Sequence, residues 1–162
     1  MGPGFAERGV GWRVMARQLY ETDGDRSKEE SAKAVLEMAW GAVFHKLPVK
    51  YGADWIAVRE GKAVAVLEYK NRPHQHDRYP TYLLSLHKWM TVRQVAAEAK
   101  VRAFLVVEFT DGLYWAEMMD GIGETGVGGR TDRGDPDDVE PCQFVPLSCF
   151  TKLRGRLFDP PE

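Results

Sequence analysis

The chain has 162 residues, of which 44% are hydrophobic and 28% are charged, a composition typical of one globular domain with its own core. Its net charge of −2 excludes an overall positive field, so any contact with nucleic acid must use a local basic patch. No apolar stretch approaches the roughly 18 residues that a membrane-spanning helix needs. The N-terminus lacks the apolar core of a signal peptide, and Cys142 and Cys149 are expected to be reduced thiols of a cytoplasmic protein without a membrane partner.

The N-terminal quarter is predicted to be helical. Apolar residues within 12–20 follow a helical spacing, and the polar segment 21–25 ends this stretch. A second helix is predicted to begin at Ser27-Lys-Glu-Glu30, which has the form of a capping box, and to end at Gly41. The apolar stretch 12–20 would cover the core or form a dimer interface, so a homodimer is left open.

The middle of the chain is predicted to form a β-hairpin of residues 54–70 with a three-residue turn at 60–62. Counting back from this turn along both strands sets Asp54 opposite Glu68, and opposed side chains point to one face. Lys70 lies two residues beyond Glu68 and therefore shares that face. Two carboxylates and an ammonium group that meet at the open end of a hairpin can hold a divalent cation and activate water.

The second half of the chain is predicted to contain one further long helix and two buried strands. A segment at about 120–141 is rich in glycine and acidic residues and is predicted to be a flexible loop. We expect one α/β domain, residues 1–162, in which helices flank a mixed sheet. The remaining elements are expected as a loop at 71–80, the helix at 81–100, the strands at 103–109 and 113–118, and a strand or short helical segment at 144–158.

Asp54, followed by Glu68-x-Lys70 on an apolar strand, resembles the motif of the PD-(D/E)XK nuclease superfamily. The order of elements over residues 27–118 is similar to that of archaeal Holliday-junction resolvases and small phage endonucleases. One departure is Ala53, which stands where the family has a proline before the aspartate. The resemblance implies a restriction-endonuclease-like fold with a mixed central sheet flanked by helices.

The resemblance also implies a role for each residue of the motif. Asp54 and Glu68 would bind Mg²⁺, or Mn²⁺ in its place, with the backbone carbonyl of Tyr69 as a third protein ligand, since Mg²⁺ prefers oxygen ligands. The cation would polarise the scissile phosphate and lower the pKa of a bound water. Lys70 would position that water or stabilise the charge that develops on the phosphate.

A glutamate of the first predicted helix completes the implied catalytic set. The spacing to Gly41 favours Glu30, although a capping-box role for the same residue is an equal alternative. Glu29 and Glu37 are the other candidates. A purely structural salt bridge between Glu68 and Lys70 is also left open.

Basic residues gather directly after the predicted hairpin. The stretch 70–93 contains a single acid, Asp77, and its aromatic residues alternate with cations. His74 and His76 are expected to be exposed rather than metal-bound, because no third ligand lies nearby. The residues expected to contact the phosphate backbone of DNA are Arg72, Arg78, Lys88 and Arg93.

These observations predict a metal-dependent nuclease that hydrolyses phosphodiester bonds in DNA, with structure-specific or junction-resolving cleavage left open. The alternative is a catalytically inactive module of the same fold that binds nucleic acid or a protein partner. In a third interpretation, Asp54, Glu68 and Lys70 form one buried ion-pair network whose role is structural.

Overall fold

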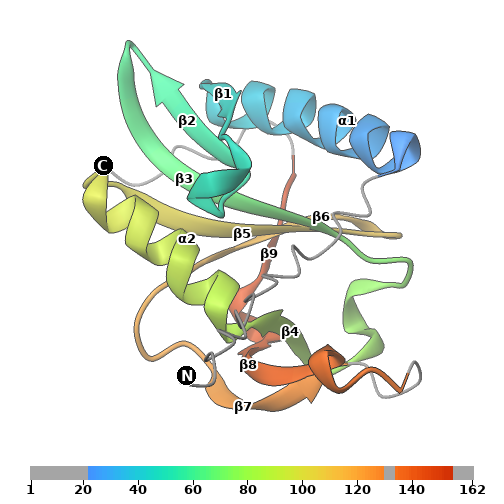
Figure 1. The fold of residues 1–162 in the computed structure, drawn as a ribbon. Coiled ribbons are helices and arrows are strands. Elements are labelled where there is room, and N and C mark those ends of the chain that lie inside the picture. The colour runs from blue at the N-terminus through green and yellow to red at the C-terminus, as the bar shows by residue number, and fades with distance from the viewer. Residues whose placement is uncertain (1–21, 130–133, 155–162) are drawn as a thin grey trace, which may run out of the picture.

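The chain folds into two β-sheets and two α-helices in the computed structural model, which describes residues 22–129 and 134–154 (Figure 1). The helices are α1 (Asp23–Trp40) and α2 (Leu86–Glu98). The strands are β1 (Val43–Lys46), β2 (Trp55–Arg59), β3 (Lys62–Asn71), β4 (Thr81–Ser85), β5 (Arg102–Phe109), β6 (Gly112–Glu117), β7 (Glu124–Gly129), β8 (Val139–Pro146) and β9 (Thr151–Lys152). No helix among the described residues is long and apolar enough to cross a membrane. The helical stretch predicted at 12–20 lies outside the described residues.

The larger sheet has six strands in the order β1-β2-β3-β5-β6-β9. Its central pair, β3 and β5, is parallel, while its other pairs are antiparallel, so the sheet is mixed as predicted. A smaller antiparallel sheet has the order β4-β8-β7. The chain passes through β4 and α2 on its way from β3 to β5, because a parallel pair needs a crossover connection.

The two helices cover opposite faces of the larger sheet (Figure 1). On one face, α1 buries Leu36 and Trp40 against strand residues such as Leu67. On the other face, α2 and the smaller sheet share a core with Val66 of β3 and Leu105 of β5. The predicted fold, a mixed sheet flanked by helices, is therefore confirmed.

The hairpin of β2 and β3 reaches the predicted register by a different route. Its turn has two residues, Glu60 and Gly61, both with positive φ, so Arg59 pairs with Lys62. A bulge then inserts Val64 into β3, which shifts the register by one residue. The two turn residues and the one bulge residue together replace the three loop residues that we expected, so the count of residues between the paired positions is unchanged. Trp55 therefore pairs with Leu67.

The helix α1 begins four residues earlier than predicted. Thr22 is its N-cap and forms a capping box with Asp25, so Ser27 and Glu30 have no capping role. Residues 23–25, part of the segment that we expected to end a helix, lie in its first turn, since Asp side chains are favourable near a helix N-terminus. The predicted end holds, because Gly41 is the C-cap with φ of 58°.

The predicted helix at 81–100 is wrong in its first five residues. They form β4, in which Tyr82 and Leu84 are buried and their neighbours are less so. Alternating burial is typical of a strand. A five-residue strand directly before a helix is too short for sequence periodicity to separate it from the helical pattern of the residues that follow.

The predicted flexible loop at about 120–141 is also wrong in part, because residues 124–129 form the edge strand β7. Its glycines permit close packing against the neighbouring strands. A Cβ at Gly126 would lie 2.9 Å from the Phe144 ring, and one at Gly128 would lie 2.9 Å from Leu83. The glycines therefore reflect close packing within a sheet rather than a loop.

Candidate active site

Glu68 is the only charged side chain that is buried in the described part of the chain, with an exposed fraction of 0%. It lies on β3, which is hydrogen-bonded to β2 on one side and to β5 on the other. Val66 packs on the same face as Glu68 and Leu67 packs on the opposite face. The sequence therefore places an ionisable group inside an otherwise apolar strand, where a charge is costly unless it is paired or bound to a cation.

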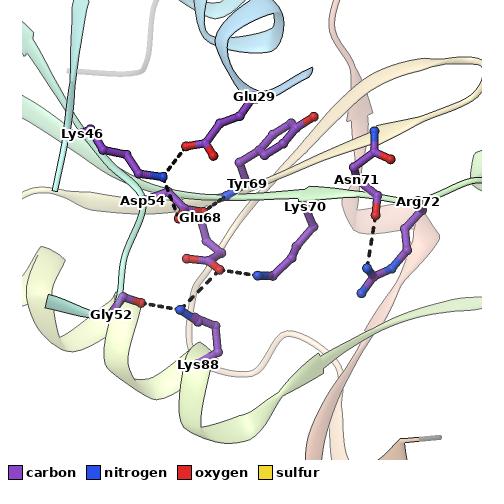
Figure 2. A network of polar contacts seen from close by, with 10 residues as sticks. All are labelled: Glu29, Lys46, Gly52, Asp54, Glu68, Tyr69, Lys70, Asn71, Arg72 and Lys88. Carbon is purple, nitrogen blue, oxygen red and sulfur yellow. Dashed lines mark hydrogen bonds and ion pairs between the residues drawn. The ribbon is translucent and has the colours of Figure 1, made fainter. Parts of the chain in front are cut away.

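Two lysine ammonium groups face the Glu68 carboxylate (Figure 2). The Nζ atoms of Lys70 and Lys88 lie 2.7 Å and 3.5 Å from the same oxygen, Oε1. Among the described residues, neither oxygen of Glu68 accepts a hydrogen bond of normal geometry. Burial raises the pKa of Glu68 above its ordinary value, the charge of Lys70 opposes this rise, and the nearby Asp54 adds to it.

Asp54 lies directly before β2 and is fixed by two hydrogen bonds to β3. Its backbone N–H donates to the Leu67 carbonyl at 3.1 Å, and its Oδ2 accepts the backbone N–H of Tyr69 at 2.8 Å. Continuing the register by one residue sets Asp54 opposite Glu68, and its carboxylate lies beside that of Glu68 (Figure 2). The Tyr69 carbonyl points to the same edge of β3 as the Tyr69 N–H and lies beyond the last residue of β2.

The oxygen atoms at this place fit a divalent cation of the Mg²⁺ type. Among the described residues, no group of three or more His, Cys, Asp and Glu side chains is arranged to hold a metal. A cation here would therefore use the carboxylates of Asp54 and Glu68 and the Tyr69 carbonyl, and its remaining positions would be filled by water. Mg²⁺ takes oxygen ligands and keeps several waters, and Oε2 of Glu68 has no hydrogen-bond partner among the described residues.

The glutamate that α1 contributes is Glu29, not Glu30. The Glu29 carboxylate forms an ion pair with Lys46 of β1, and the Lys46 Nζ also lies 3.5 Å from Asp54 Oδ1 (Figure 2). Glu30 points away from this cluster, with a side chain that is 74% exposed and paired with Lys33 at 4.0 Å. The expectation for Glu30 is thus corrected, because adjacent helix residues face directions about 100° apart.

Glu37, the other candidate from α1, has a structural partner. Its Oε1 accepts the backbone N–H of Phe44 at 2.8 Å and lies 4.0 Å from the Lys33 Nζ. It therefore ties the end of α1 to β1. From the sequence, Lys46 is by default a solvated loop charge that could flank the cleft, because its position opposite Trp55 depends on the pairing of β1 with β2.

A pocket with a volume of about 470 Å³ opens beside the two carboxylates. The α1 side of the pocket is lined by Glu29 and Lys46, and the α2 side by Lys88. Asp54 and Lys70 lie between them. The buried Glu68 is therefore covered by residues that line an open cavity of the size of a small-molecule or nucleotide site.

Of the four basic residues that we expected to contact DNA, two line the pocket and two lie outside it. Arg72 and Lys88 line the pocket. Arg78 lies over the Tyr79 ring, and Arg93 forms an ion pair with Asp120 at 2.6 Å, so neither is brought to the pocket. Arg72 also donates to the carbonyl of Asn71 at 3.2 Å (Figure 2), and its guanidinium lies 5.1 Å from the centre of the Tyr82 ring.

The histidines of the segment 71–80 are placed by aromatic rings and one carboxylate. The Nδ1 of His76 lies 2.5 Å from Asp111 Oδ2, and its ring stacks on Tyr114 with 4.5 Å between centres. His74 packs edge-on against Tyr79 at 5.3 Å. The prediction of exposed histidines thus missed the His76–Asp111–Tyr114 cluster, whose members come together only when the β5–β6 turn meets this segment.

Comparison with known proteins gives one family and one fold. A family model described as phage putative PDDEXK endonuclease matches residues 15–153. Among solved structures, the chain is similar to Hjc, a Holliday junction resolvase from the archaeal hyperthermophile Archaeoglobus fulgidus. The TM-score is 0.53 and the identity 11%, over 82% of this chain and 93% of that chain, so this likeness concerns the fold. No curated protein matches the chain in sequence.

Proposed function

The chain belongs to the family of phage putative PDDEXK endonucleases, and on this premise we propose that it is a Mg²⁺-dependent nuclease that cleaves phosphodiester bonds in DNA. The single observation that carries the proposal is the fully buried Glu68 carboxylate, which lies beside Asp54 and faces the ammonium groups of Lys70 and Lys88. A buried charge is costly unless it is paired or bound to a metal, and here two carboxylates lie side by side while both lysines approach Oε1 of Glu68. A cation bound between the carboxylates would offset their mutual repulsion. Mn²⁺ is expected to substitute for Mg²⁺, since both accept oxygen ligands.

The reaction is the addition of water to phosphorus and the cleavage of one P–O ester bond. A cation held by Asp54, Glu68 and the Tyr69 carbonyl would supply a polarised phosphate and a water of lowered pKa. The Lys70 side chain is 32% exposed and its ammonium is anchored on Glu68, so it can hold the attacking water or a phosphate oxygen. The hydrogen bond from Tyr69 N–H keeps the Asp54 carboxylate oriented.

The DNA backbone would enter by the pocket. The Arg72 side chain lines it next to Lys70, and a guanidinium matches the geometry of a phosphate. The Lys46 ammonium lies at the opposite wall, where it is paired with Glu29 and Asp54. The net charge of the whole chain is −2, so this local charge would carry the attraction, and binding should weaken as salt is raised.

Cleavage assays on the full chain test the proposal. We expect supercoiled plasmid or a synthetic four-way junction to be cut in Mg²⁺ or Mn²⁺, and not in EDTA. Asp54→Asn keeps the size of the side chain and should abolish cleavage while the protein still binds DNA. The proposal fails if no DNA substrate is cut in either metal, or if Asp54→Asn cuts as well as the wild type. DNA binding without any cleavage would favour the inactive binding module.

A further inference from the structure

Lys88 of α2 contacts both segments that carry the carboxylates of the site. Its Nζ donates a hydrogen bond of 2.8 Å to the carbonyl of Gly52, which lies two residues before Asp54 (Figure 2). The same Nζ lies 3.5 Å from Glu68 Oε1. One ammonium group thus joins α2 to the loop that carries Asp54 and to the strand that carries Glu68.

Gly52 is held against α2 by a second contact that involves no charge. Its φ is +69°, and an added Cβ would lie 2.5 Å from the Cγ2 methyl of Thr91. Thr91 is three residues after Lys88 and therefore lies on the same face of the helix. The Thr91 methyl occupies the space that a side chain at position 52 would need, so only glycine permits this approach.

We propose that Lys88 and Thr91 are positioning residues, which fix the loop 49–53 against α2 and thereby set the Asp54 carboxylate beside Glu68 for a cation. This inference rests on the proposed function. It replaces the expectation that Lys88 contacts the phosphate backbone of DNA. The 3₁₀ turn Val49–Tyr51 and Gly52 lead directly into Asp54, so a shift of this loop moves the carboxylate with it.

The partners of Lys88 support positioning over phosphate binding. An ammonium has three N–H donors, of which one is used by the Gly52 carbonyl while the Glu68 oxygen lies within ion-pair distance. A phosphate would have to compete with a carboxylate that is fully buried and cannot move to water. Arg72, by contrast, has a planar group with five donors, and among the described residues its guanidinium donates one hydrogen bond, to the Asn71 carbonyl, so it has donors to spare for a phosphate.

The first test is Lys88→Met, which keeps the alkyl chain and removes the ammonium. Mn²⁺ affinity of the full chain is measured by titration calorimetry without DNA, and DNA affinity is measured in EDTA. We expect the Kd for Mn²⁺ to rise about tenfold, as is usual when a residue that orients a metal ligand is lost. We expect DNA affinity to change by less than about twofold. Arg93→Met is the matched control, because it removes a cation from the same helix outside the pocket.

The outcomes of this titration are distinct. A large loss of DNA affinity with unchanged Mn²⁺ affinity would make Lys88 a phosphate contact and overturn the proposal. Tighter Mn²⁺ binding would make it a competitor of the cation and overturn the proposal equally. If the wild type itself binds neither Mn²⁺ nor Mg²⁺, the proposed function fails too, whereas equal binding by wild type and Lys88→Met sinks only the positioning role.

The second test uses the contact of Gly52 with Thr91. Gly52→Ala should weaken Mn²⁺ binding, and Thr91→Ser in the same chain should restore part of it, because serine lacks the methyl group that an alanine Cβ would meet. Gly61→Ala is the matched control, since Gly61 has a similar φ of +74° with nothing within 4 Å of an added Cβ. We expect this control to lower the melting temperature without changing the Kd for Mn²⁺. Equal Mn²⁺ affinities for Gly52→Ala and Gly61→Ala would contradict the proposal, and the Lys88→Met titration decides it if Gly52→Ala does not fold.

Discussion

Glu68 and Asp111 are both carboxylates held close to other polar groups, yet their surroundings are opposite. Glu68 is fully buried and accepts no hydrogen bond of normal geometry among the described residues. Asp111 is partly exposed, and its two oxygens accept the His76 backbone N–H at 2.9 Å and the Tyr114 hydroxyl at 3.1 Å. Glu68 is desolvated and is compensated in part by the charges of two lysines, whereas Asp111 exchanges water for hydrogen bonds from the protein.

The direction in which each carboxyl pKa is shifted follows from this difference. Burial raises the pKa of Glu68, because the charged form loses its hydration. Desolvation acts in the same sense on Asp111, but hydrogen bonds from His76 and Tyr114 outweigh it and lower its pKa to about 2. A group that the fold holds in its charged form by hydrogen bonds adds stability, whereas a buried charge without them reduces it. The His76–Asp111–Tyr114 cluster is therefore expected to stabilise the fold, and the Glu68 cluster to perform chemistry.

Of the variants that test the comparison of Glu68 with Asp111, Glu68→Gln is expected to have the largest effect. The amide keeps the shape of the side chain but binds a divalent cation poorly, so cleavage should fall by at least about 10²-fold. Stability should stay equal or increase, because replacing a buried charge is often neutral or favourable and both lysines can turn their ammonium groups to water. Cleavage rates and thermal melts in EDTA measure the two effects. A large loss of stability would favour the interpretation of the cluster as a structural ion-pair network.

A smaller effect is expected from the glutamate of α1. In Glu29→Gln, Lys46 loses the Glu29 carboxylate, while its ion pair with Asp54 remains. The cation must then compete with Lys46 for the Asp54 carboxylate. We expect cleavage to fall about 10- to 100-fold and the Mg²⁺ concentration for half-maximal rate to rise. Glu30→Gln is the matched control on the neighbouring residue and should cut like the wild type, because Glu30 is largely exposed. The reverse order of the two variants would contradict the placement of α1.

The sequence was sufficient to predict that Asp54, Glu68 and Lys70 lie together, because their arrangement is local. Asp54, Glu68 and Lys70 belong to one hairpin, and the alternation of a strand decides which side chains share a face. The register was correct although the turn was not, since the bulge at Val64 offset the shorter turn at Glu60 and Gly61. A bulge leaves no sequence signal of its own here, so this agreement could not have been foreseen.

The surroundings of the site could not be read from the sequence, because they depend on contacts between distant elements. The choice between Glu29 and Glu30 depends on the rotation of α1 about its axis, which is set by burial of Leu36 and Trp40. The tether from Lys88 to Gly52 spans 36 residues. Periodicity gives the face of a helix to within about one residue, and one residue separates a glutamate in the pocket from one in solvent.

The smallest expected effect is that of Asp111→Asn, and it concerns stability rather than cleavage. The pKa of Asp111 is lower in the folded chain, about 2, than its ordinary value of 3.8. Its contribution is therefore present above pH 4 and is lost as the pH falls from about 4 to about 2. Because the side chain is partly exposed, we expect a loss of only about 1 kcal/mol in the free energy of unfolding at pH 7, with cleavage unchanged. Urea unfolding at several pH values measures this, with Asp120→Asn as a control that removes a highly exposed carboxylate and should cost less than about 0.5 kcal/mol. A difference between wild type and Asp111→Asn that is as large at pH 2 as at pH 7 would show that the carboxylate charge is not its source.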